Sequence, residues 1–169
     1  MKNCCILIFL VAVSVSCSPT RIYFVRHAEK SLEVKVDPPL TPEGAARAAE
    51  LANMLKGKGI RSIYSTKTTR TATTAQPLAE KLGIPIRFYS HDTMPRFLYT
   101  LLASGETALV VGHSNTVLKM ISELELSPSQ KEIPDSVYDN LYIVSLKNRN
   151  SRSGYRLLLK ETTFGKPSR

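Results

Sequence analysis

Apolar and polar residues alternate in blocks along this chain, and the blocks predict strands and helices in turn. An apolar run begins at residue 21 and ends in Arg26 and His27, and short apolar runs of strand-like composition follow at 62–65, 85–89 and 107–111. Between them, apolar residues recur at i, i+3, i+4 and i+7, the spacing of a helix with one buried face. Alternation of this kind predicts an α/β fold, a three-layer structure whose mostly parallel central sheet carries helices on both faces.

Local signals mark where the first two helices begin and end. Thr41 is a plausible N-cap, and Pro42 follows at the first helical position, where its missing N–H costs nothing. Gly57 and Gly59 are expected to end the first helix, and Gly83 the second. Pro77 is expected to kink the second helix or to disturb its first turns.

The last two predicted strands, near residues 141–146 and 155–161, are joined by the turn-rich segment 147–154. They predict a hairpin at one edge of the sheet. A brief helix is expected around 95–103, and another with an apolar face after residue 115.

The first residues have a different composition from the predicted globular part. Lys2 precedes an apolar run at 4–13, small residues and Cys17, which is the pattern of a secretory signal. Residues 14–17 also resemble a bacterial lipoprotein signal, in which Cys17 would become the lipid-modified first residue; ordinary cleavage between residues 16 and 18 is the alternative. The expected organisation is a signal peptide at 1–16, a tether at 17–20 and one domain at 21–169, placed as an exported, membrane-anchored lipoprotein.

Charge and cysteine content narrow the chemistry of that domain. All three cysteines lie in the first 17 residues, so the domain has no thiol nucleophile, disulfide pair or thiolate metal site. The formal net charge of +9 favours anionic partners. Because the basic residues are scattered and form no block interleaved with aromatics, a small phosphorylated substrate is favoured, and nucleic acid is not expected.

Two histidines stand at the ends of predicted parallel strands, where an α/β sheet gathers its reactive groups. His27 ends the first strand, and His113 follows the most apolar one. Arg26 and Arg70 fall at a strand end and a helix start. Guanidinium groups match phosphate oxygens and keep their charge, and an imidazole nitrogen can attack phosphorus. The four residues therefore predict a phosphate site with His27 as nucleophile.

Four motifs in this order resemble the histidine phosphatase superfamily, which has the phosphoglycerate mutase-like fold. They are the residues 26–29 (Arg-His-Ala-Glu), 40–44 (Leu-Thr-Pro-Glu-Gly), 64–75 around Arg70, and 112–114 (Gly-His-Ser). The short connections resemble a compact member without a large cap insertion. Lys67 stands where a proline is common in the family.

The resemblance implies that His27 becomes phosphorylated, that Arg26 and Arg70 bind the phosphate, and that His113 completes the catalytic site. Glu29, Ser65 and Ser114 would help to bind or orient the substrate. The implied mechanism uses neither a metal nor another cofactor.

The general acid departs from the family pattern. Many family phosphatases carry an acidic residue directly after the second histidine, where this chain has Ser114. Asp92, in the short connection after the third strand, is the nearest candidate, and Asp139 is a second. His91 lies in a loop with no motif around it and is not expected to take part in the chemistry.

Several functions remain open on these residues. The first is a phosphatase that acts through a phosphohistidine intermediate. Without an acid, substrates with good leaving groups are favoured, such as acyl phosphates or phosphohistidine, although an exported location argues against a signalling phosphohistidine. An exported module that binds a phosphorylated ligand with little turnover is the alternative from a different class. A mutase would need a capped pocket, and the short connections offer little cover.

Overall fold

The computed structural model describes residues 19–148 and 155–168. Six strands form one sheet in the order β3-β2-β4-β1-β5-β6. The strands are β1 (Thr20–Arg26), β2 (Ser62–Ser65), β3 (Ile86–Phe88), β4 (Ala108–Gly112), β5 (Asn140–Asn148) and β6 (Tyr155–Thr163). The helices are α1 (Pro42–Leu55), α2 (Thr69–Leu82), α3 (Met94–Ser104) and α4 (Ser114–Glu123), with a 3₁₀ turn, η1 (His91–Thr93), before α3.

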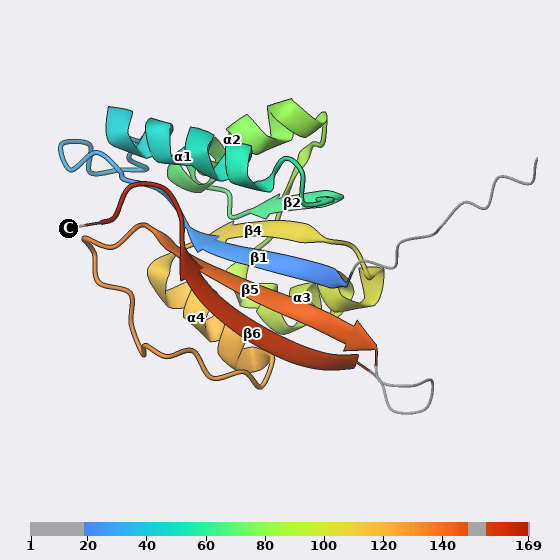
Figure 1. Cartoon of the computed structure of the whole chain (residues 1–169). Helices are drawn as coiled ribbons and strands as arrows, with labels where there is room; N and C mark the ends of the chain where they lie inside the picture. The colour runs from blue at the N-terminus through green and yellow to red at the C-terminus, as the bar shows by residue number, and fades with distance from the viewer. Residues whose placement is uncertain (1–18, 149–154, 169) are drawn as a thin grey trace, which may run out of the picture.

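Helices cover both faces of this sheet, which confirms the predicted three-layer α/β architecture. Helices α1 and α2 lie on one face, and α3 and α4 on the other (Figure 1). Side chains of β1 alternate between the two apolar cores: Tyr23 and Val25 pack in the core under α1 and α2, and Ile22 and Phe24 in the core with α3 and α4. This two-sided burial explains why the middle of the strand, Ile22 to Val25, is apolar without a break.

β1 joins the parallel and antiparallel parts of the sheet. It pairs with β4 in parallel and with β5 antiparallel, and β2 pairs in parallel with both β3 and β4. The antiparallel pair β5–β6 is the predicted hairpin at the sheet edge. The carboxyl ends of the four parallel strands therefore meet at one edge, where β1 and β4 end in register at Arg26 and Gly112.

Two predicted helix caps, Thr41 at the start of α1 and Gly83 at the end of α2, agree with the structure. The Thr41 hydroxyl accepts a hydrogen bond from the Gly44 amide, 3.1 Å away, at the start of α1. Gly83 ends α2 with φ of 65°, a left-handed conformation that glycine adopts at little cost. Pro77 lies inside α2 without dividing it, since the proline removes only one hydrogen bond from a helix that is packed along its length.

The predicted signal peptide and Cys17 lie outside the described residues. Among the residues that the structure describes, no helix is long and apolar enough to cross a membrane.

Gly44 brings the start of α1 against the chain just after His27. A Cβ atom at this position would lie 2.2 Å from the carbonyl oxygen of Glu29 and 3.0 Å from its amide nitrogen. The motif therefore needs glycine because the helix packs directly on the backbone at the carboxyl edge of the parallel strands.

We predict that Gly44→Ala lowers the free energy of unfolding by about 1–3 kcal/mol, because backbone atoms cannot yield to a new methyl group. Gly57→Ala is the matched control, since a Cβ there would meet nothing within 4 Å. Urea unfolding of both variants checks this. Equal stabilities would show that the contact between α1 and Glu29 is not tight.

Candidate active site

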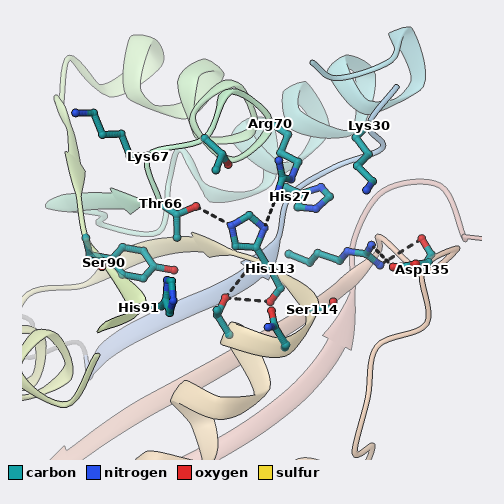
Figure 2. Close-up of a pocket in the computed structure, with 15 residues that line it drawn as sticks. His27, Lys30, Thr66, Lys67, Arg70, Ser90, His91, His113, Ser114 and Asp135 are labelled. Atoms are coloured by element: carbon teal, nitrogen blue, oxygen red, sulfur yellow. Dashed lines mark hydrogen bonds and ion pairs between the residues drawn. The ribbon is translucent and has the colours of Figure 1, made fainter. Parts of the chain in front are cut away.

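A cavity of about 700 Å³ lies at the carboxyl ends of the parallel strands. All four residues predicted for catalysis line this cavity. Arg26 and His27 come from the end of β1, Arg70 from α2, and His113 from the residue before α4 (Figure 2). Its lining comprises Arg26, His27, Lys30, Thr66, Lys67, Thr68, Arg70, Tyr89, Ser90, His91, His113, Ser114, Asn115, Thr116 and Asp135. The sheet thus brings the predicted constellation into one space.

Backbone hydrogen bonds fix both the position and the tautomer of His27. Its amide donates to the Gly112 carbonyl at 2.9 Å, and its Nδ1 lies 2.8 Å from the carbonyl oxygen of Ala28. Because a carbonyl only accepts, Nδ1 carries the proton and Nε2 keeps its lone pair. Burial, reinforced by the nearby charges of Arg26 and Arg70, lowers the pKa of His27 to about 3. At neutral pH this imidazole is therefore uncharged, with a nucleophilic Nε2.

The two terminal nitrogens of the Arg26 guanidinium group are held by the loop before β5. Its Nη1 donates to the backbone carbonyls of Pro134, at 2.8 Å, and Val137, at 3.0 Å. Its Nη2 donates to the Asp135 carboxylate at 3.0 Å, and the group lies over the Tyr138 ring, 4.5 Å from its centre. The buried Nε–H has no partner. The loop before β5 thus fixes the arginine while leaving a donor unsatisfied.

Arg70 and His113 hold each other in place. Arg70 Nη2 lies 3.3 Å from His113 Nδ1, and because guanidinium only donates, this nitrogen accepts. His113 Nε2 then carries the proton and donates to the Thr66 hydroxyl at 3.0 Å. Burial, followed by the charges of Arg70 and Arg26, lowers the pKa of His113 to about 4. The Nε–H of Arg70 is also buried without a partner.

The two imidazoles meet edge to face, with ring centres 5.5 Å apart. They stand among two permanent cations, and each arginine keeps one buried N–H unsatisfied. A buried donor without an acceptor costs about 1–3 kcal/mol. An anion with several oxygens would relieve both costs and would favour protonated imidazole, so the arrangement is suited to phosphate.

Asp37 contacts the helix that carries Arg70, and the sequence around it gave no sign of this contact. Its carboxylate accepts hydrogen bonds from the amide and hydroxyl of Thr69 at the start of α2, at 2.9 and 2.5 Å, which lower its pKa. It also lies 3.7 Å from Arg70 Nη1. Its backbone has φ of 44°, in the left-handed region. Only the folded loop brings this aspartate to the helix that carries Arg70.

Two residues predicted to contact the substrate lie elsewhere. Glu29 accepts hydrogen bonds from Arg47 of α1, with a shortest distance of 2.7 Å, and it is absent from the lining of the cavity. Ser65 is fully buried and donates to the Thr66 carbonyl. Both side chains therefore support the walls of the site. Ser114 does line the cavity, as predicted.

The structure also revises the search for a general acid. Asp92 is 78% exposed and does not line the cavity, whereas its neighbour His91, which we did not expect to take part, does. Asp139 is buried elsewhere and accepts from the Ser168 amide. Asp135, Lys30 and Lys67 are further lining residues that lay outside the predicted set. Their positions depend on loops whose course the sequence pattern does not specify.

No group of three or more potential metal ligands occurs among the residues that the structure describes. The cations of the cavity are arginine and lysine side chains, which suit an anionic ligand.

Comparison with known families agrees with this geometry. Residues 22–91 match the model of the histidine phosphatase superfamily, branch 1. Over 76 residues the chain is 36% identical to the "Probable phosphoglycerate mutase GpmB" of Escherichia coli, which covers 41% of this chain and 35% of that relative. The chain thus matches about a third of the length of the curated relative.

Solved structures extend the likeness over most of the chain. A mycobacterial glucosyl-3-phosphoglycerate phosphatase superposes with a TM-score of 0.63 at 14% identity, covering 84% of this chain and 97% of that one. The protein histidine phosphatase SixA, complexed with tungstate, gives a TM-score of 0.62 at 20% identity, covering 85% and 97%. At these identities the likeness is one of fold. The sequence match to the histidine phosphatase superfamily, branch 1, covers residues 22–91, the part of the chain that carries His27 and Arg70.

We predict that His27 and His113 stay neutral well below the ordinary histidine pKa of 6.5, with the proton on Nδ1 of His27 and on Nε2 of His113. Both pKa values lie below those of the unfolded chain, so the unfolded state binds more protons as the pH falls from about 6.5 to about 4. Stability should therefore decrease over that interval. Titration of ¹⁵N-labelled histidines by NMR checks the assignment.

Inorganic phosphate should raise both pKa values, because an anion among the arginines stabilises imidazolium. Ordinary titration near pH 6.5 without phosphate, or no response to phosphate, would contradict this electrostatic description of the site.

Proposed function

We propose that this protein is a phosphatase that transfers a phosphoryl group from a small phosphorylated substrate to His27 and then to water. The observation that carries the proposal is the pair of buried, unpartnered Nε–H groups of Arg26 and Arg70 beside an uncharged His27. The arginines offer donors to phosphate oxygens, and the histidine offers an unprotonated nucleophile.

In the first step, His27 Nε2 attacks phosphorus as the bond from phosphorus to the leaving oxygen breaks, and the electron pair of that bond leaves with the oxygen. The hydrogen bond from Nδ1 to the Ala28 carbonyl stabilises the positive charge that develops on the ring. Arg26, Arg70 and His113 stabilise the charge on the other phosphate oxygens. No metal or other cofactor takes part in this proposal.

In the second step, water attacks the phosphohistidine. The bond from phosphorus to Nε2 breaks, its electron pair returns to the ring, and inorganic phosphate leaves. The cavity suits this step because it opens to solvent beside the exposed side chains of Asp135 and His91. A mutase would instead have to keep water from the intermediate.

Acyl phosphates and phosphohistidine are a second candidate substrate class. One observation favours them: Asp92 and Asp139, the carboxylates predicted as acids, do not line the cavity. Good leaving groups need less protonation as they depart. Phosphate esters such as the substrate named for the mycobacterial neighbour would need a proton from another group.

We predict that His27→Ala reduces hydrolysis of p-nitrophenyl phosphate to the background rate while the fold is retained, because no other group in the cavity replaces the nucleophile. Incubation of the parent with acetyl [³²P]phosphate should give an acid-labile, alkali-stable phosphoprotein that the variant lacks. Addition of EDTA should leave the parental rate unchanged.

Equal turnover by His27→Ala would exclude the covalent mechanism. Reversible binding of phosphate by the parent, without covalent label or turnover, would identify the chain as a binding module instead.

We further propose that residues 1–16 direct export and that Cys17 carries a lipid, so that the domain is held at a membrane outside the cytoplasm. The support is the sequence pattern of Lys2, the apolar run and Cys17.

We predict that the full chain, expressed in a bacterium, incorporates labelled palmitate and fractionates with membranes, and that Cys17→Ser abolishes the label. Release of unlabelled parental protein into the soluble periplasm would indicate ordinary signal cleavage. Retention of residues 1–16 on a cytoplasmic protein, determined by mass spectrometry, would exclude export.

A further inference from the structure

We propose that His91 is the proton donor to the leaving group, and that Asp92 is its positioning residue. This inference rests on the proposed phosphatase function, and it supplies the acid that the carboxylates predicted from the sequence do not provide.

The position of His91 within the cavity is the first support. His91 begins the 3₁₀ turn η1, which follows β3 by two residues, and its side chain lines the same cavity as both strand-end histidines. In Figure 2, His91 and His27 lie on opposite sides of His113. A leaving group departs from the side of phosphorus opposite the nucleophile, because attack and departure are in line. A substrate attacked by His27 would thus turn its leaving group away from His27, toward the part of the lining that includes His91.

Asp92 lies within ion-pair distance of the His91 ring. Its Oδ1 is 3.1 Å from His91 Nε2, so the carboxylate faces a protonated ring directly. The other carboxylate oxygen accepts from the Ser90 hydroxyl at 3.1 Å, and that hydroxyl in turn accepts from the Asp92 amide. Because Nε2 faces Asp92, we assign Nδ1 as the nitrogen through which a protonated ring donates to a ligand.

The other acidic groups of the cavity lining are less suited to this role. The Asp135 carboxylate already accepts a hydrogen bond from Arg26 and so is occupied as the partner of that guanidinium group. The Tyr89 hydroxyl donates to the Val111 carbonyl, and burial raises its pKa. Lys30 and Lys67 carry ammonium groups, which suit the binding of an anion as point charges. Histidine is the side chain type that gains and loses a proton most readily in this range.

The donated proton balances the first chemical step. As the bond from phosphorus to the leaving oxygen breaks, the proton moves from His91 Nδ1 to that oxygen, which leaves as an alcohol. His91 is then neutral. When water attacks phospho-His27, Nδ1 of His91 takes up one proton of that water, and phosphate and the protonated ring are restored. The substrate class that needs this group is the alkyl phosphates, whose alkoxide leaves poorly without a proton.

The test compares leaving groups in the first step alone. Rapid-quench measurements follow formation of phospho-His27 from glycerol 3-phosphate, p-nitrophenyl phosphate and acetyl phosphate, with the full-length protein and with His91→Asn. We expect the variant to lose about 10²-fold or more in the rate with glycerol 3-phosphate and to change little with acetyl phosphate. Asp92→Asn should show a smaller loss of the same selectivity, because the ring remains but loses the carboxylate that positions it.

Tyr99→Phe is the matched control, because its side chain is 76% exposed on the neighbouring α3 and does not line the cavity. An equal loss with all three substrates in His91→Asn would indicate a structural or binding role and would overturn the proposal, as would no loss with any of them. If the parent forms no phosphohistidine at all, the proposed phosphatase function fails first. The two failures are thus distinguishable.

Discussion

The hydrogen bond between the His27 amide and the Gly112 carbonyl is the constraint on which the site depends. It continues the parallel pairing of β1 and β4 by one residue beyond the end of β1, onto the last residue of β4. His27 therefore cannot shift along the sheet without breaking the register of the two central strands. The same contact places His27 beside His113, which directly follows Gly112. Two imidazoles from distant parts of the sequence are thus positioned by main-chain geometry, and their side chains need only the correct rotation.

The electrostatic environment of these side chains is unfavourable for the protein without a ligand. Two guanidinium groups stand beside two buried imidazoles, and both rings respond with a lowered pKa. Each arginine also keeps a buried Nε–H without a partner. The loop before β5, the Arg70–His113 contact and the Asp37 carboxylate hold these groups in place nonetheless. Such an arrangement lowers the stability of the free protein. In return, its donors bind an anion without having to rearrange, as is common where binding groups are fixed in advance of their ligand.

The sequence pattern was sufficient to predict the architecture and to predict which four residues converge at the centre of the cavity. The reason differs in each case. The layers follow from apolar periodicity, because β1 must bury both faces and each helix only one. Arg26, His27, Arg70 and His113 were predictable because strand ends and helix starts converge in any parallel sheet. Glu29 was misplaced because its partner, Arg47, is 18 residues away and competes successfully for the carboxylate. His91 lines the cavity and Asp92 does not, because one short turn decides which of two adjacent side chains faces the cavity. Pattern and spacing carry no information about that rotation.

The direction of β1 determines which end of the sheet the cavity occupies relative to the start of the domain. The strand runs for seven residues from Thr20 to Arg26, and in Figure 1 the chain enters it at the end of the sheet remote from the loop after His27. At roughly 3.3 Å per residue, this separates its two ends by about 20 Å. If Cys17 carries the proposed lipid, the membrane lies toward the amino end of β1 and the cavity lies at its carboxyl end. Such an orientation would present the cavity to solutes of the surrounding compartment, beyond most of the electrostatic field of the lipid headgroups.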